Sequence, residues 1–248
     1  MAQGFFGVTM IKNSSNKSML TENFLTINFS KWMAALIFLV FFSFSAGNAQ
    51  EIAPIDDTVQ KLQLVYEKTG DFRAAFTQET FNKSLKRTMT EEGSVFFKKP
   101  RNMRWDYSKP EVKKLIINPQ KAWLYLPREK AAYVQKADNI FQSATLLRFL
   151  SGLGKLKDDF QINYAAPEAL DKHGNYLLKL TPKEKNSYLQ ALGITLDKDT
   201  YFIIQVSFED LMGNITTLKF SNIVMNNGLS DKLFKFQPPA GTNIFDMP

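Results

Sequence analysis

The chain has no cysteine and only one histidine among its 248 residues. The lack of cysteine excludes disulfides, thiol nucleophiles and a lipid anchor of the bacterial lipoprotein type. The single histidine, His173, lies in a Lys-His-Gly-Asn sequence that is typical of a solvated turn. The chain therefore has almost no residues for a catalytic site that pairs histidine with serine or cysteine. It also lacks the residues for a histidine-rich metal site.

Other sequence signatures of catalysis are also missing. Gly152-Leu-Gly-Lys155 is too short to be a phosphate-binding loop of the GxxxxGK type. The acid pairs are adjacent in sequence, and on a strand adjacent side chains point to opposite faces, so no carboxylate dyad is indicated. We therefore predict that the protein is not an enzyme and holds no metal or other cofactor.

Basic residues are in excess but scattered. The net charge is +7, and no block of five or more like charges occurs. An acidic partner or a phospholipid surface suits this charge better than nucleic acid, because the chain carries an export signal.

That signal is an apolar run at Trp32–Ser45, directly after Lys31. It is shorter than the roughly 20 apolar residues of a membrane span, and small residues follow at Gly47 and Ala49. We expect residues 1–49 to be a signal peptide that is cleaved after Ala49, with an uncleaved signal anchor as the alternative. The remaining residues 50–248 are then expected to form a single exported domain that is soluble, with a net charge of +5. The translation start stays open among Met1, Met10 and Met19.

One helix is expected near the start of this domain, at Thr58–Lys68. Asp57 or Thr58 is the expected N-cap, and Gly70 is expected to end the helix. The apolar residues recur at helical spacing: Val59, Leu62, Val65 and Tyr66.

From Phe72 onward, the apolar period changes to two, which favours half-buried antiparallel strands. Ten or eleven strands are expected, too many for a sheet that does not curl. The fold class is therefore mainly β (α+β), with one strongly curved antiparallel sheet. Phe141–Leu150 interrupts the pattern as a short helix, which we expect to lie across a mouth of the sheet, with one apolar stripe formed by Leu146, Leu147 and Leu150.

Apolar bulk is abundant, with 22 Phe, 9 Met, 8 Tyr and 3 Trp. Such residues fill the core of any domain of this size, and that interpretation stays open. On a concave sheet they also suit an apolar ligand. Composition and periodicity by themselves predict a secreted β-rich domain with a lipid-binding capacity.

Four segments resemble the outer-membrane lipoprotein carrier family (LolA). Asp71-Phe-Arg-Ala-Ala-Phe-Thr-Gln78 resembles the family's x-A-x-F-x-Q strand, and Trp123-Leu-Tyr125 its W-x-Y strand. Gly93-Ser-Val-Phe-Phe-Lys-Lys-Pro100 with Met103-Arg-Trp105 is similar to the signature G-x-(L/V)-x-(V/F)-(K/R)-(K/R)-P-x-x-(F/M)-(R/N)-W. Phe234-Lys-Phe-Gln-Pro-Pro-Ala-Gly241 is similar to the closing F-x-F-x-P-P-x-G. The four segments occur in the family's order across residues 58–246.

The resemblance implies an incomplete β-barrel of about 11 strands, closed by helices around an apolar cavity for lipoprotein acyl chains. It further implies a periplasmic carrier that takes lipoproteins from an inner-membrane ABC-type complex and passes them to an outer-membrane receptor. The expected form is a monomer. The alternative is a lipid-sensing or regulatory envelope domain of the same fold, which binds acyl chains without transferring cargo.

The resemblance also implies site residues. The lid is Phe141–Leu150, and Lys99 is its expected latch, at a position where the family often has arginine. Lysine lacks the planar fork of arginine, so Arg101 or Arg104 could hold the lid instead. The residues expected to line the cavity are Met103, Trp105, Phe72, Phe76, Trp123, Tyr125, Leu62 and Tyr66.

Overall fold

The structure, a computed structural model, describes residues 52–138, 156–183 and 189–247. The predicted signal peptide with its cleavage after Ala49, and the predicted lid with Leu146, Leu147 and Leu150, lie outside the described residues. None of the helices in the described part of the chain has the length and apolar character that a membrane crossing requires.

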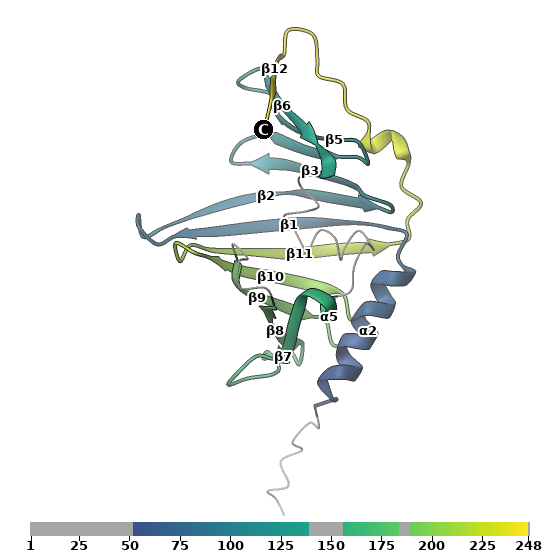
Figure 1. Ribbon diagram of the computed structural model, residues 1–248, viewed down its shortest axis with the longest axis vertical. Helices are drawn as coiled ribbons and strands as arrows, with labels where there is room; N and C mark the ends of the chain where they lie inside the picture. Colours follow the sequence, from purple (N-terminus) through teal and green to yellow (C-terminus); the bar gives the residue numbers. More distant parts are fainter. Residues whose placement is uncertain (1–51, 139–155, 184–188, 248) are drawn as a thin grey trace, which may run out of the picture. The chain divides into compact units, whose positions relative to one another are not determined.

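The described residues form twelve strands and three helical segments (Figure 1). The helical segments are α2 (Ile55–Lys68), α5 (Leu156–Asp159) and the 3₁₀ helix η1 (Asp231–Phe234). The strands are β1 (Asp71–Asn82), β2 (Arg87–Lys98), β3 (Asn102–Lys109), β4 (Lys113–Ile117), β5 (Lys121–Leu126), β6 (Ala131–Lys136), β7 (Phe160–Tyr164), β8 (Tyr176–Pro182), β9 (Leu189–Leu196), β10 (Ile203–Asp210), β11 (Ile215–Met225) and β12 (Asn243–Asp246).

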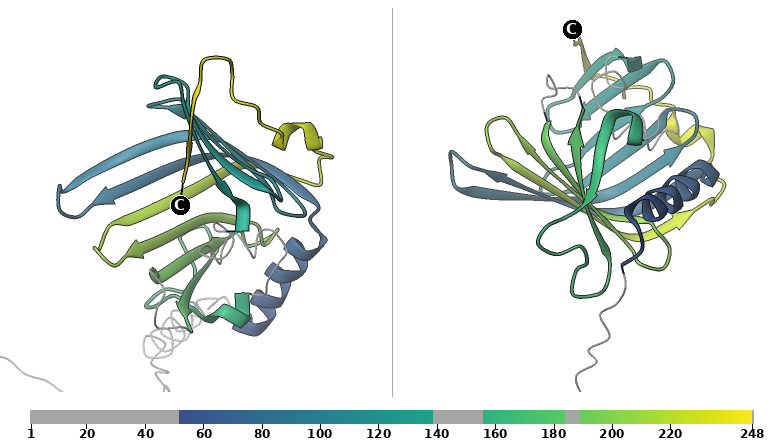
Figure 2. Two further views of the ribbon diagram at one scale, coloured as in Figure 1. Left: turned by 45° about the horizontal axis from the view of Figure 1, so that its top comes forward. Right: turned by 60° about the horizontal axis from the view of Figure 1, so that its bottom comes forward.

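All twelve strands belong to one sheet with the order β12-β6-β5-β4-β3-β2-β1-β11-β10-β9-β8-β7. Every pairing is antiparallel except that of β12 with β6. The outermost strands β7 and β12 are not neighbours, so the sheet is curved but not closed (Figure 2). The predicted fold class, an incomplete curved barrel, is confirmed, with twelve strands in place of about eleven.

Helix α2 begins earlier than its sequence suggests. Its first residue is Ile55, and Pro54 occupies the N-cap without a side-chain hydrogen bond, so the predicted cap at Asp57 or Thr58 is wrong. Thr58 is instead fully buried, and its hydroxyl lies 2.7 Å from the Tyr164 hydroxyl on β7. A hydroxyl that bonds a tertiary partner is not available to cap the helix.

Helix α2 ends at Lys68, as predicted. Thr69 is the C-cap, where its N–H donates to the Tyr66 carbonyl, and its hydroxyl donates to the Val65 carbonyl at 2.8 Å. Gly70 lies one residue further on, and its N–H donates to Oδ1 of Asn226. The predicted apolar stripe of the helix is confirmed, because its members are buried or pack against the core: Val59, Leu62, Val65 and Tyr66.

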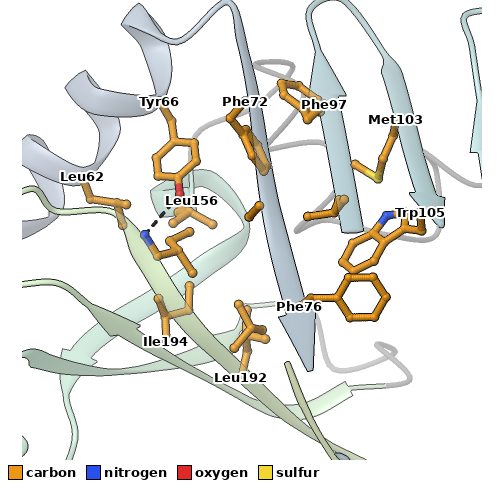
Figure 3. Packing of buried hydrophobic residues seen from close by; sticks show 14 of the residues in the cluster. Leu62, Tyr66, Phe72, Phe76, Phe97, Met103, Trp105, Leu156, Leu192 and Ile194 are labelled. Atoms are coloured by element: carbon orange, nitrogen blue, oxygen red, sulfur yellow. Dashed lines mark hydrogen bonds between the residues drawn. The ribbon is translucent and has the colours of Figure 1, made fainter. Parts of the chain in front are cut away.

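Apolar side chains form clusters on both faces of the sheet. The larger cluster lies on the inner face, where α2 and α5 pack, and includes Leu62, Phe97 and Leu156 (Figure 3). The smaller cluster lies on the outer face of β4–β6, around Ile116 and Trp123. Strands β4 and β5 therefore bury apolar side chains on both faces, with Ile117 and Ala122 in the inner cluster and Ile116 and Trp123 in the outer one.

The cover on the outer face is the C-terminal segment, residues 226–247. It leaves β11, crosses β3 as η1, and ends as β12 beside β6 (Figure 1). The buried Asp71 carboxylate accepts the N–H groups of Asn227, Gly228 and Leu229 at 2.7–3.2 Å. Three backbone bonds to one carboxylate fix the direction in which the segment leaves the sheet.

Candidate functional site

The inner face holds an apolar cavity of about 80 Å³. Its walls come from α2 and from strands β1, β3, β10 and β11. No charged side chain is among the residues that line it, which are Tyr66, Phe72, Ala74, Trp105, Ile203, Val206, Leu218, Phe220, Ile223 and Met225.

Two bulges shape the wall that β10 and β11 form. In β11, Leu218 and Phe220 line the cavity, and so do Ile223 and Met225, although these two pairs have opposite parity in the sequence. The register with β1 shifts between these pairs, beside Asn222, whose φ is +53°. Asparagine tolerates this left-handed conformation better than most residues. The extra residue returns Ile223 and Met225 to the inner face and bends the strand.

A second bulge lies in β10, between Ile203 and Gln205. It places Ile203 and Val206 on the cavity side, whereas the strict alternation of the sequence puts these two residues on opposite faces. Bulges increase local twist and curvature. The two irregularities therefore curl this part of the sheet around the cavity.

A close-packed aromatic group supports the wall at Trp105. The Phe76 ring lies edge-on to Trp105 and to Tyr107, with centroids 4.8 and 5.0 Å apart. Gly93 on β2 makes room for it, because a Cβ there would lie 2.8 Å from the Phe76 ring and 2.1 Å from the Asp106 carbonyl oxygen. The glycine of the signature motif therefore serves the packing of this wall.

The predicted cavity residues fall into three groups. Tyr66, Phe72 and Trp105 line the cavity. Leu62, Phe76 and Met103 belong to the same buried cluster and pack around it without lining it.

Trp123 and Tyr125 do not lie at the cavity, which corrects the prediction for these two residues. They belong to the outer-face cluster, where Phe236 of the C-terminal segment contacts both rings at centroid distances of 5.6 and 5.3 Å. In β5 it is Ala122 that belongs to the inner cluster, so the alternation of the strand directs Trp123 outward.

Tyr66 joins α2 to the cavity wall. Its buried hydroxyl accepts the N–H of Ile203 at 3.1 Å, beside the bulge in β10. Burial raises the pKa of Tyr66 well above its usual value, because the phenolate would lie in an apolar environment. The residue thus remains a neutral, hydrogen-bonded part of the wall.

Lys99 lies at the C-terminal end of α2. Its ammonium donates to the carbonyls of Tyr66 and Glu67 at 2.7 and 3.0 Å. A cation at these carbonyls also suits the negative end of the helix dipole. Burial lowers the pKa of Lys99, and the Glu67 carboxylate opposes that shift. Within the described residues, Lys99 therefore fastens α2 to the start of the β2–β3 turn.

The two arginines that could replace Lys99 as latch lie apart from each other. Arg104 points to the outer face, where it donates to both carboxylate oxygens of Asp106 and to the Leu233 carbonyl of η1 at 3.0 Å. It alternates with Met103 and Trp105, which face inward, so it holds the C-terminal segment. Arg101 pairs with Asp138, the last described residue before the predicted lid.

Polar residues border the aromatic group on the side away from α2. Glu91 accepts from Lys113 at 2.6 Å and from Gln78 at 3.0 Å, and the Lys113 ammonium lies 4.3 Å from the centroid of the Tyr107 ring. Burial, assisted by Glu91, raises the pKa of Tyr107 to about 12. The apolar part of the inner face therefore ends at a set of mutually bonded polar groups.

The remaining candidates for chemistry lie away from the cavity. His173 is exposed in the turn before β8, where its backbone N–H donates to Oδ1 of Asp171. No group of three or more His, Asp or Glu side chains that could hold a metal ion occurs in the part of the chain that the structure describes.

The arrangement suits the end of an apolar chain. Its volume is about half of the ~150 Å³ that admits a benzene molecule in an engineered cavity. A long acyl chain needs more room, so the inner face must expand to take one.

The cavity-lining residues of β10 and β11 were not predicted from the sequence. In β11, the alternation of Leu218 and Phe220 was a usable signal for these two residues, and the parity change after Phe220 concealed Ile223 and Met225. In β10, the bulge after Ile203 concealed that Ile203 and Val206 share a face.

Known proteins resemble the chain along most of its length. Residues 67–237 match the sequence model of the family described as outer membrane lipoprotein carrier protein LolA. An outer-membrane lipoprotein carrier protein of Methylococcus capsulatus is 29% identical over 187 residues, which are 75% of this chain and 86% of the relative. One of Pseudomonas aeruginosa is 28% identical over 197 residues, 78% of this chain and 90% of the relative.

A solved structure shows a similar fold. An uncharacterized conserved protein from Thermus thermophilus superposes with a TM-score of 0.50 at 13% identity, covering 77% of this chain and 98% of its own. At that identity the likeness concerns the fold only. The family match spans more than half of the sequence, and the chain belongs to the outer membrane lipoprotein carrier protein (LolA) family.

Proposed function

We propose that the protein is a periplasmic carrier that shields the acyl chains of lipoproteins between the inner and the outer membrane. The observation that carries the proposal is the uncharged cavity on the inner face, in a chain whose relatives are named lipoprotein carrier proteins. The cavity is the site that we assign to the acyl chains. It lies in the periplasm once the leader has been removed.

The site has to offset the free energy by which the acyl chains of the cargo prefer a membrane. An acyl chain prefers a membrane by about 0.8 kcal/mol per buried CH₂, so two or three chains make spontaneous escape negligible. A soluble carrier has to replace most of that burial, yet not all of it, or it could not unload. Met225 in the cavity wall and Met103 behind it suit chains without fixed shape, because methionine adapts to irregular contacts.

Helix α2 is the element whose displacement would enlarge the cavity, because Tyr66 forms part of the wall. Polar contacts fasten it along its length. Thr58 bonds Tyr164 and Asp56 pairs with Lys157 in its first turns, and Lys61 bonds Tyr201 further on. Lys99 and the Tyr66 hydroxyl hold its C-terminal end, where Tyr66 borders the cavity, and we assign the role of latch to Lys99. Cargo that contacts the open form better than the closed one would shift the population toward the open form.

Energy for loading has to come from a partner, since the sequence contains no nucleotide-binding loop. We assign this role to an inner-membrane ABC-type complex, and the receiving role to an outer-membrane receptor. The proposal is tested with proteoliposomes that contain a lipoprotein and such a release complex. The lipoprotein should appear in the soluble fraction, bound to this protein, only when ATP is present. Efficient extraction from vesicles without the complex and ATP would contradict the proposal.

The same preparation separates a carrier from a lipid-sensing domain of the same fold. The loaded protein is mixed with fresh vesicles that carry an outer-membrane receptor. A carrier passes the lipoprotein to these vesicles, whereas a sensor retains its acyl ligand. Retention of all cargo would favour the sensor.

A further inference from the structure

Two neighbouring hairpins expose apolar side chains at their tips. One connects β1 to β2 through residues 83–86, and the other connects β10 to β11 through residues 211–214. Large hydrophobic residues that are exposed elsewhere in the described chain are scattered, but six gather here: Phe81, Leu85, Met89, Leu211, Met212 and Ile215. Leu85 and Met212 are the most exposed, at 74% and 79%. An exposed group of apolar side chains of this kind often marks a site of interaction with a protein or a membrane.

The two tips form one surface. The Lys83 N–H donates to Oδ1 of Asn214 at 3.1 Å, and Phe81 lies opposite Ile215 in the β1–β11 register. The Lys83 side chain lies across Gly213, where a Cβ would be 2.7 Å from Cδ of the lysine. Gly213 has a φ of +79° and gives the close approach that joins the tips.

The β1–β2 hairpin projects beyond its neighbour β3. β2 pairs with β3 only from Glu92 onward, so residues 87–91 have β1 as their sole strand partner. Five residues of strand extend about 17 Å at ~3.4 Å per residue. Figures 1 and 2 show both tips projecting at the same end of the sheet. The tips can therefore touch a flat surface before β3–β6 do.

The charge around the apolar tips is mainly positive. Lys83, Lys86 and Arg87 are exposed, and within the described residues none of them forms an ion pair. The acids near this end are Glu79, Glu209 and Asp210, and Glu79 pairs with Lys219 at 2.9 Å. The Asp210 carboxylate is directed into its own turn, where it accepts the N–H groups of Met212 and Asn214.

We propose that these tips dock the protein on an anionic phospholipid surface. Leu85, Leu211 and Met212 enter the boundary between headgroups and acyl chains, and the three cations contact lipid phosphates. Apolar insertion combined with basic residues is the combination that holds peripheral proteins on bilayers. Three side chains without a lipid anchor give weak, reversible binding, as a protein that visits a membrane surface requires. The docking surface is separate from the acyl-chain cavity and does not depend on the function proposed for it.

The test is flotation of the cargo-free protein, purified after expression of the full-length chain, with vesicles of phosphatidylcholine alone or mixed with phosphatidylglycerol. The protein should float with the mixed vesicles, and added salt should reduce this binding. L85S combined with M212S should weaken binding about tenfold or more. Lys86→Ser should weaken binding about fivefold, as expected for one cation at an anionic surface.

A matched control is V112S combined with I244S, since both residues are exposed apolar side chains on other parts of the described chain. This variant should float like the parent protein. The proposal is overturned if the parent protein does not bind the mixed vesicles, or if both double variants bind equally. Acyl-chain binding by L85S/M212S, measured in parallel, should be unchanged, so that failure of the docking surface is distinguishable from failure of the carrier function.

Discussion

The inner-face cluster around Trp105 and the outer-face cluster around Trp123 are alike in composition and differ in what covers them. The two tryptophans have similar exposures, 9% and 8%, and both contact other aromatic rings. Trp123 is covered by Phe236 of its own chain, whereas Trp105 borders a cavity. Burial alone therefore does not distinguish the two tryptophans. The group that covers each of them does: within the described residues, a cavity borders Trp105, and Phe236 packs on Trp123.

The largest expected effect is that of a charge on the cavity wall. Trp105→Glu should abolish acyl-chain binding, because a carboxylate at this position would be desolvated by the ligand. Trp123→Glu should leave that binding within about twofold and should instead release the C-terminal segment, which limited proteolysis detects. Binding is measured with a fluorescent fatty acid on protein whose near-ultraviolet circular dichroism shows a folded state.

A control for the added charge is Val112→Glu, at a residue that is 47% exposed. It should bind the fatty acid like the parent protein. Equal loss of binding in Trp105→Glu and Trp123→Glu would break the distinction between the two faces.

The next largest effect concerns the cover of the outer face. Phe234 is 1% exposed, and Phe234→Ala should lower the free energy of unfolding by about 3–5 kcal/mol, as for other buried phenylalanines. Denaturant unfolding measures this change. The affinity of the folded variant for a fatty acid should stay the same. A parallel loss of affinity would show that the two faces are coupled.

A smaller loss of stability is expected at the start of the C-terminal segment. Asp71→Asn removes one of the two acceptor oxygens that bind three backbone N–H groups, and should cost about 3 kcal/mol. Asp199→Asn, at an exposed turn, is the control and should change stability by less than about 0.5 kcal/mol. Urea unfolding with both variants decides the matter, and equal midpoints would contradict the anchoring role of Asp71.

The smallest effect is expected for the bond between α2 and the cavity wall. Tyr66→Phe leaves the Ile203 N–H without its acceptor and should cost about 1–2 kcal/mol. Since burial raises the pKa of Tyr66, its contribution to stability is present below the usual tyrosine pKa and is lost as the pH rises above it. Between pH ~8 and pH ~11, the parent protein should therefore lose more stability than Tyr66→Phe.

Tyr133→Phe is the matched control, because its ring stacks on Phe245 at the sheet edge. This variant should change the free energy of unfolding at neutral pH by less than about 0.5 kcal/mol. An identical alkaline loss in Tyr66→Phe and the parent protein would contradict the assignment.

Much of the fold was predictable from local pattern. The apolar stripe of α2 and the period-two strands follow from spacing alone, and the four motifs indicated the family and the curved sheet. The end of α2 at Lys68 was predictable, but its start at Ile55 was not, because Thr58 bonds Tyr164, a residue more than a hundred positions away. The N-cap preference of threonine was overridden by this tertiary contact.

The site was predictable in part. Tyr66, Phe72 and Trp105 lie where the prediction placed them, since their strands and helix keep a regular period up to the cavity. Leu218 and Phe220 alternate regularly and could have been predicted. The other lining residues of β10 and β11 were concealed, because bulges change the parity of each strand, which alternation cannot reveal. Trp123 and Tyr125 were assigned to the wrong face, since a strand that is apolar on both sides gives no sign of which side faces a cavity.

The most direct test of the central claim uses a photo-reactive amino acid at position 105 and, in a second variant, at position 123. Each variant is loaded with a lipoprotein, irradiated, and analysed by mass spectrometry of the cross-linked peptides. If the inner-face cavity holds the acyl chains, adducts with these chains form at position 105 and none form at position 123. Adducts at position 123, or their absence at position 105 in a loaded protein, would contradict this assignment.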